Sequence, residues 1–217
     1  MQIIGFCRFS YPADGGFQVE HETIDDRMAY LYSEARMQER FAHFECICLP
    51  GLKAQSDPDF AFVILVGDQM PAPYRAQLDA LVADFEQAHV VALPPMAHRK
   101  ACQTVLNAAR DMDQPCLQFR HDDDDAVAVD FVAHLRQAAD DIAPLLARNR
   151  YVGFDWNRGY VGRPDARGIC AEETVTPYWG VAEAMYVKAG TQQTIMNVGH
   201  NKINRFMPTV TFTDPPM

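Results

Sequence analysis

Four consecutive aspartates, Asp122–Asp125, are the residues of this sequence whose type and spacing most clearly suggest chemistry. Carboxylates this close repel one another by about 1 kcal/mol or more per pair at interfacial dielectric. Such a run needs solvent, a helix N-terminus or a cation, and its position in mid-chain between two apolar segments excludes a solvated tail. Mg²⁺ and Mn²⁺ take oxygen ligands, commonly one or two carboxylates together with substrate phosphates. The run therefore predicts a site for one of these cations.

Spacing within the run suggests which aspartates bind the metal. Side chains two positions apart point the same way in an extended segment, which favours Asp122 and Asp124 as ligands. Asp125 would support the metal, through water, or cap a following helix. Asp123 is predicted to contact the phosphorylated ligand that binds together with the cation. Helix capping alone is the structural alternative, but one or two aspartates would be enough for it.

Charged residues after other apolar runs are candidates for binding a phosphorylated ligand. Arg8 ends the first apolar run, an unusual place for a charge unless it faces a site. Arg99 and Lys100 lie just past another run and could hold a diphosphate by charge-assisted hydrogen bonds. Asp68 could accept from a ribose or a base. The plain alternatives are a turn residue for Asp68 and a solvated first helical turn for Arg99 and Lys100.

Three further carboxylates are candidates for a general base, namely Glu172, Glu173 and Asp155. Glu172 and Glu173 form the best carboxylate pair outside the run, although a solvated pair is the ordinary interpretation. The histidines lack the H-x-x-x-H spacing of a zinc site. The sequence also lacks the G-x-G-x-x-G, P-loop and G-x-S-x-G motifs. The sequence therefore gives no support to a dinucleotide-binding fold, a P-loop enzyme or a hydrolase with a nucleophile elbow.

Alternating apolar and amphipathic segments predict the elements that position these residues. Apolar runs predict strands over 3–9, 60–66, 89–93 and 116–119. Helical periodicity predicts one helix after each of these strands, over 26–48, 73–85, 98–112 and 129–142. This alternation predicts an α/β fold with a mostly parallel central sheet flanked by helices. Ligands then bind beyond the carboxyl ends of the strands, where the candidate residues converge. Pro144 should kink or stop the last helix. Further strands or ordered loops are expected over 151–161 and 174–188, and a helix within 190–206.

Bulk composition indicates one ordinary globular domain. The 217 residues are 48% hydrophobic, enough for a single core over 1–217, with a nucleotide-binding half at 1–130 and an acceptor-side half at 131–217. A net charge of −10 argues against nucleic acid as a partner. Six cysteines without paired spacing predict free thiols and a cytoplasmic location. No signal peptide and no membrane-spanning stretch is predicted.

Two segments of the chain resemble glycosyltransferase family 2. The first is Cys48–Gln55 followed by Asp59-Phe60 and then Val63–Asp68, and the second is Asn107–Arg110 followed by Phe119–Asp125. More narrowly, Arg120–Ala126 together with the preceding Asp59-Phe60 is similar to a bacterial rhamnosyltransferase family. The resemblance covers roughly residues 1 to 130 in general form.

This resemblance implies the A-type glycosyltransferase fold and a nucleotide diphosphate sugar donor such as dTDP-rhamnose. It also implies a saccharide or other hydroxyl acceptor, and Mg²⁺ or Mn²⁺ as cofactor. Asp122 and Asp124 match the metal motif, and Asp68 matches the acid that contacts the nucleotide. Gly67 stands where the family often has a second acid, and the final third does not place the family's catalytic acid. Because the chain ends early, we expect either a truncated chain or an incomplete site. A metal-dependent phosphoester hydrolase and a non-catalytic nucleotide-sugar-binding module remain alternatives.

Overall fold

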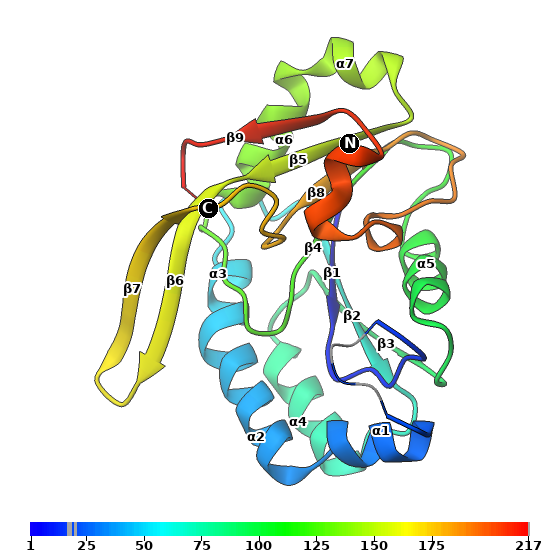
Figure 1. Cartoon of the computed structure of the whole chain (residues 1–217), viewed down its shortest axis with the longest axis vertical. Helices are drawn as coiled ribbons and strands as arrows, with labels where there is room; N and C mark the ends of the chain where they lie inside the picture. Colours follow the sequence, from blue (N-terminus) through cyan, green and yellow to red (C-terminus); the bar gives the residue numbers. More distant parts are fainter. Residues whose placement is uncertain (17–18, 20, 217) are drawn as a thin grey trace.

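A seven-stranded sheet forms the centre of the computed structural model, which describes residues 1–16, 19 and 21–216 (Figure 1). Its strand order is β3-β2-β1-β4-β8-β5-β9. Four strands pair in parallel, as the apolar runs predict: β1 (Gln2–Arg8), β2 (Ala61–Gly67), β3 (Ala88–Leu93) and β4 (Cys116–Arg120). The remaining three come from the second half of the chain: β5 (Tyr151–Trp156), β8 (Ala184–Val187) and β9 (Thr209–Phe212). Strand β8 runs antiparallel to both its neighbours, so the sheet is mostly parallel.

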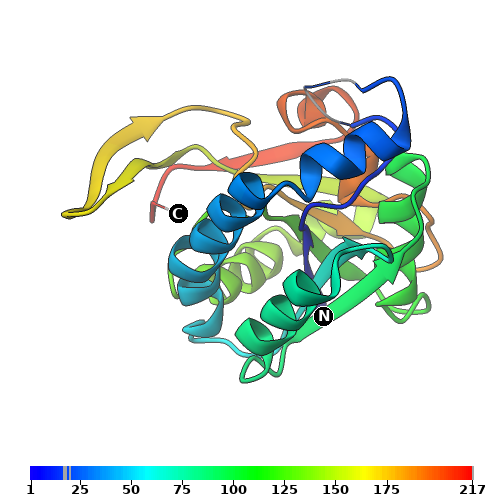
Figure 2. The same ribbon diagram turned by 90° about the horizontal axis from the view of Figure 1, so that it is seen from below.

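Helices cover both faces of the sheet (Figures 1 and 2). One face packs against a helical layer made of α2 (Glu34–His43), the π-helical turn η1 (Phe44–Cys48), α3 (Leu49–Lys53), α4 (Ala72–Val82), α6 (Phe131–Asp141) and α7 (Ala143–Arg148). The other face packs against α5 (His98–Ala108) and the 3-10 helices η2 (Ile195–Asn197) and η3 (His200–Arg205). The short helix α1 (Ile24–Leu31) precedes α2. The predicted three-layer α/β arrangement is confirmed.

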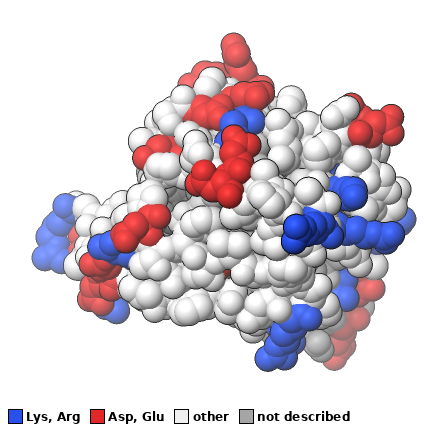
Figure 3. All heavy atoms as spheres, turned by 90° about the horizontal axis from the view of Figure 1, so that it is seen from above, with Lys and Arg blue, Asp and Glu red and all other residues white. Residues whose placement is uncertain are grey.

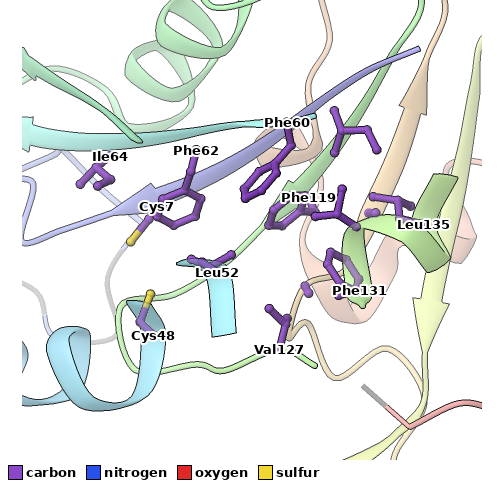
Figure 4. Close-up of a cluster of buried hydrophobic side chains, with 14 of the residues drawn as sticks. Cys7, Cys48, Leu52, Phe60, Phe62, Ile64, Phe119, Val127, Phe131 and Leu135 are labelled. Carbon is purple, nitrogen blue, oxygen red and sulfur yellow. The ribbon is translucent and has the colours of Figure 1, made fainter. Parts of the chain in front are cut away.

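Aromatic rings fill the core between β1, β4 and the first helical layer (Figure 4). Phe119 lies edge-on to Phe131, with ring centroids 5.1 Å apart. Gly5 allows this packing, because a Cβ there would lie 2.3 Å from Cζ of Phe119 and 2.8 Å from Cδ2 of Phe62. The central strand therefore needs glycine at this position for a steric reason rather than a conformational one.

A hairpin of β6 (Arg158–Asp165) and β7 (Gly168–Val175) projects from the body as a separate two-stranded sheet, which we call the arm (Figures 1 and 2). Nearly all of its residues are exposed. On the face seen in Figure 3, Lys and Arg side chains occur in separate groups interspersed with Asp and Glu. Over the described part of the chain, no helix is both long and apolar enough to cross a membrane.

Several predicted helices differ from those observed. The helix predicted over 98–112 ends at Ala108, and the one predicted over 129–142 begins at Phe131. Pro144 ends that helix as predicted, but it does so within the first turn of α7, where a missing N–H costs nothing. The region 190–206 forms two short 3-10 helices rather than one helix.

Candidate functional site

Two connected cavities open at the carboxyl ends of β1 and β4, the edge on which the candidate residues were expected to converge. The smaller has a volume of about 440 Å³ and the larger about 790 Å³. Both are lined by Gly16, His98, Arg120 and Met196. Volumes of this order suit a small organic ligand. The larger cavity also contains all four aspartates of the run.

The aspartate run forms a reverse turn, which we call the acid turn (Asp122–Asp125). The backbone N–H of Asp125 donates to the carbonyl oxygen of Asp122 at 3.2 Å. The run is therefore not extended, as the reasoning from side-chain alternation assumed. Asp122 and Asp124 are nevertheless the two exposed members, while Asp123 is buried. Asp125 does not cap a helix, because α6 begins only at Phe131.

Gln55, at the end of the α3 segment, fixes the chain that follows the acid turn. Its side-chain nitrogen donates to the carbonyl oxygens of Gly51 and Ala128, both at 2.8 Å. Its side-chain oxygen accepts from the N–H of Val132 at 2.8 Å. Gly51 lets the helix approach closely, since a Cβ there would lie 2.4 Å from the carbonyl oxygen of Val127. The acid turn is thus held from one side by a helix about seventy residues earlier in the chain.

Arg40 on α2 compensates part of the negative charge of the acid turn. Its Nη1 atom lies 3.0 Å from Oδ1 of Asp123 and 3.0 Å from Oδ2 of Asp124. Arg36 and Arg40 both line the larger cavity, although neither was among the predicted site residues. Their spacing of four residues, which puts two arginines on one helix face, was the available signal.

Burial and crowding shift the ionisation of the acid turn. Burial raises the pKa of Asp123 to about 6, although Arg40 opposes the shift. Burial and the neighbouring charges of Asp122 and Asp124 raise the pKa of Asp125 to about 7. Burial also lowers the pKa of His121 to about 4, so this histidine is neutral near pH 7. The turn therefore carries less than four full negative charges near neutral pH.

Positive charge also lines the cavities, at Arg8, Arg99 and Arg120, which we call the cationic side. Arg8 Nη1 donates to the carbonyl oxygen of Gly16 at 3.0 Å. Arg120 Nη2 donates to the carbonyl oxygens of Ile195 and Val198 at 2.7 and 2.6 Å. In the first turn of α5 the N–H of His98 donates to the carbonyl oxygen of Asp14 and that of Lys100 to the carbonyl oxygen of Ala97, both at 2.9 Å, so this turn contributes the positive end of the helix dipole.

His98 remains uncharged within this group of cations. Burial and the charges of Arg8, Arg120 and Arg99 lower the pKa of His98 to about 4. The arginine charges that add to the effect of burial on His98 also favour an anion at the same place. The cavities thus have a cationic side and an acidic side.

The other predicted binding residues are divided between the cavities and the surface. Arg8 and Asp123 line the larger cavity and Arg99 lines the smaller one. Asp68 and Lys100 are exposed, and neither lines these two cavities in the described structure. Asp68 follows β2 as predicted, but its N–H donates to Leu93 and its side chain stays in solvent.

The structure does not bring the three predicted bases into either cavity. Glu172 and Glu173 lie on the exposed arm, where Glu173 pairs with Arg158. Asp155 is buried in β5 and accepts hydrogen bonds from the N–H of Tyr178 at 3.0 Å and from Oγ1 of Thr211 at 3.1 Å. The sequence pattern alone does not indicate that Glu172 and Glu173 lie on an exposed hairpin, or that Asp155 is a buried carboxylate that holds backbone and side-chain donors. Among described residues, Glu39 and the acid turn supply the carboxylates of the larger cavity.

The carboxylates of the acid turn suit a cation that a ligand helps to hold. Among the described residues, no group of three or more His, Cys, Asp or Glu side chains is arranged to hold a metal ion. Mg²⁺ usually takes only one or two carboxylates when substrate phosphates complete its shell. Asp122 and Asp124 offer two exposed carboxylates facing a cavity, so these residues fit such a shared site.

A family model described as "Putative rhamnosyl transferase" matches residues 2–217. The chain belongs to this family. Comparison with curated proteins gives no match.

Among solved structures, S. aureus TarS 1-349 is similar over 100% of this chain and 59% of its own, with a TM-score of 0.51 and 11% identity. The TarS complex with UDP-GlcNAc matches 72% of this chain and 34% of its own, with a TM-score of 0.41 and 15% identity. The chain thus spans about a third to three fifths of these TarS chains. The first likeness confirms the predicted A-type glycosyltransferase fold of this family member.

Proposed function

We propose that this protein is a metal-dependent glycosyltransferase that moves a sugar from a nucleotide diphosphate donor to a hydroxyl acceptor. The observation that carries the proposal is a cavity at the carboxyl edge of the sheet that is lined both by the acid turn and by the cations Arg8 and Arg120. Family membership favours transferase chemistry and names rhamnose, with dTDP-rhamnose as the donor to test first.

The diphosphate of the donor would bind at the cationic side. Arg8 and Arg120 line the larger cavity and Arg99 the smaller, so charge-assisted hydrogen bonds are available along the shared wall. The positive end of the dipole of α5 would also favour a phosphate there. His98 itself adds no positive charge, because its lowered pKa of about 4 keeps the imidazole neutral near pH 7.

Asp122 and Asp124 would hold Mg²⁺ or Mn²⁺ together with the donor phosphates. When bound, such a cation would neutralise charge on the diphosphate leaving group as it develops. Arg8 and Arg120 would orient the donor on the other side. A carboxylate of the larger cavity, from Glu39 or the acid turn, would accept the proton of the acceptor hydroxyl.

Titration calorimetry with dTDP, UDP and GDP, with and without Mn²⁺, tests the proposal. Arg8→Gln should weaken binding of the preferred nucleotide about tenfold or more, because a hydrogen bond to a charged group contributes about 1.5–3 kcal/mol. Arg75→Gln is the matched control, since Arg75 lies on α4 and pairs with Asp79 in solvent. Absence of binding by every nucleotide diphosphate would refute a nucleotide-sugar function.

Turnover separates the transferase from its two rivals. Transfer from dTDP-rhamnose or another nucleotide sugar to an acceptor supports the proposal. Cleavage of a phosphate ester without any acceptor would instead indicate a hydrolase. Tight nucleotide binding with neither reaction would indicate a binding module.

A further inference from the structure

The segment Tyr178–Glu183 joins the arm to β8 in an unusual backbone conformation. Tyr178 has a φ of 57° and Ala182 a φ of 45°, both in the left-handed region that non-glycine residues rarely occupy. Gly180 between them has a φ of 103°. Three residues of this segment, Trp179 to Val181, line the larger cavity. Strained backbone of this kind persists where surrounding contacts hold it, and it is concentrated at functional sites.

Both ends of the segment are fastened to the central sheet. The N–H of Tyr178 donates to Oδ1 of Asp155 at 3.0 Å, and Oδ2 of Asp155 accepts from Thr211 at 3.1 Å. At the other end, the carbonyl oxygen of Glu183 accepts from the N–H of Arg120 at 3.1 Å. Asp155 is only 2% exposed, so its geometry is fixed by β5 and β9. These contacts set where Trp179 lies.

Trp179 is a large aromatic side chain left open at the wall of the cavity. It is 39% exposed, whereas the second tryptophan, Trp156, is 7% exposed and packs against Phe131 and Phe212. Tyr30 on α1 also lines the larger cavity and is 46% exposed. An aromatic ring offers a broad apolar face with a negative quadrupole. One face of a pyranose ring presents C–H groups that match such a surface.

Trp179 and Tyr30, which we call the aromatic wall, line the larger cavity but not the smaller one. Arg120 and His98 line both cavities, beside the first turn of α5. Trp179 and Tyr30 line only the larger cavity, which also contains the acid turn. A diphosphate on the cationic side would place the reacting sugar near the acid turn, leaving the aromatic wall for the group that receives it.

We propose that Trp179 is a stacking platform for a pyranose ring of a saccharide acceptor, and that Asp155 is a positioning residue that holds the platform. The proposal rests on the transferase function proposed above and names the acceptor class for the same site. It gives Asp155, Gly180 and the strained backbone one common purpose.

Binding of methyl glycosides tests the platform. The probes are the methyl glycosides of rhamnose, glucose, galactose and N-acetylglucosamine. Their binding to the full chain is measured by saturation-transfer NMR. We expect at least one to bind saturably, and Trp179→Ala to weaken that binding about tenfold, while Trp179→Phe retains part of it. Tyr160→Ala is the matched control, because Tyr160 is an exposed aromatic residue on the arm that lines neither cavity.

A spectroscopic readout tests the positioning role of Asp155. In a Trp156→Phe background Trp179 is the sole tryptophan, and the bound glycoside should shift its emission and protect it from acrylamide quenching. Adding Asp155→Asn should change the emission of Trp179 and weaken glycoside binding, with binding of the preferred nucleoside diphosphate unchanged within about twofold. Equal Trp179 emission and equal glycoside affinity in the Trp156→Phe protein with and without Asp155→Asn would show that Asp155 does not position Trp179.

Three results would overturn the platform. These are no binding of any of the four glycosides, equal glycoside affinity in the Trp179→Ala and Tyr160→Ala variants, and a Trp179→Ala variant that loses nucleotide affinity as strongly as glycoside affinity. Nucleotide binding is measured separately by calorimetry. Its absence in the unmodified protein refutes the proposed function, whereas its presence with any of these three results refutes only the acceptor platform.

Discussion

Arg40→Gln should strengthen the binding of Mn²⁺ to the acid turn. In the structure Arg40 Nη1 lies 3.0 Å from both Asp123 Oδ1 and Asp124 Oδ2, so the guanidinium occupies carboxylate lone pairs that a cation would use. Arginine cannot lose its proton in this setting, so the positive charge is permanent. A divalent cation must therefore bind against a fixed charge and compete for the same oxygens.

The size of the effect follows from these distances. A cation about 2.1 Å from a carboxylate oxygen would lie about 5 Å from the guanidinium. Repulsion between a divalent and a single charge at about 5 Å is about 6.6 kcal/mol at an effective dielectric of about 20 and about 1.7 kcal/mol at about 80. The side chain of Asp124 is 44% exposed, which favours the lower value. We expect about a tenfold gain in Mn²⁺ affinity, because about 1.4 kcal/mol corresponds to a factor of ten.

Calorimetric titration with MnCl₂ near pH 8 measures this change in the absence of nucleotide. Alkaline pH is chosen because the raised pKa values of Asp123 and Asp125 would otherwise mix proton release with metal binding. Arg75→Gln removes an exposed Arg–Asp pair of the same kind and should leave Mn²⁺ affinity unchanged. Equal or weaker affinity in Arg40→Gln, with intact near-UV circular dichroism, would show that Arg40 does not compete with the cation.

Two predictions concern stability, each measured by urea denaturation. Asp125→Asn should stabilise the fold near pH 8 and have little effect near pH 4. The reason is that burial raises the folded-state pKa of Asp125 to about 7, above its unfolded value. The free energy of unfolding of the unmodified protein therefore falls, by at most about 4 kcal/mol, as the pH rises from below the unfolded pKa through about 7. A stabilisation that does not grow between these pH values would contradict the assigned cause. Gly5→Ala should lower the free energy of unfolding by about 1–3 kcal/mol, because the new Cβ overlaps Phe119. Gly162→Ala, on the arm with its Cβ 3.3 Å from Ile169, should change stability much less, and equal effects at both sites would refute the packing argument.

The sequence predicts the central sheet well because burial leaves a strong pattern. The strands β1, β2 and β4 are buried on both faces and read as continuous apolar runs. Their parallel order then places Arg8, the start of α5 and the acid turn at one edge. That much of the site follows from strand direction alone.

The remaining site residues depend on contacts between distant segments, which periodicity does not record. Arg40 reads as one of several surface charges on α2, yet it contacts carboxylates more than eighty residues later. Trp179 reaches the cavity only because a strained segment returns from the arm. Glu173 pairs with Arg158 across the arm, and this hairpin pairing makes it an exposed ion pair. For each, the local sequence fits more than one tertiary environment.

The acid turn combines firm placement with unfavourable electrostatics. Gln55 joins α3 to both Ala128 and Val132, which holds the chain after the turn in one geometry. Within that geometry burial raises the pKa values of Asp123 and Asp125, so their charged forms cost stability near neutral pH. A ligand that binds the folded state and favours those charged forms recovers this free energy. A divalent cation has the charge to do so, and stability lost at the turn would then contribute to the affinity for that cation.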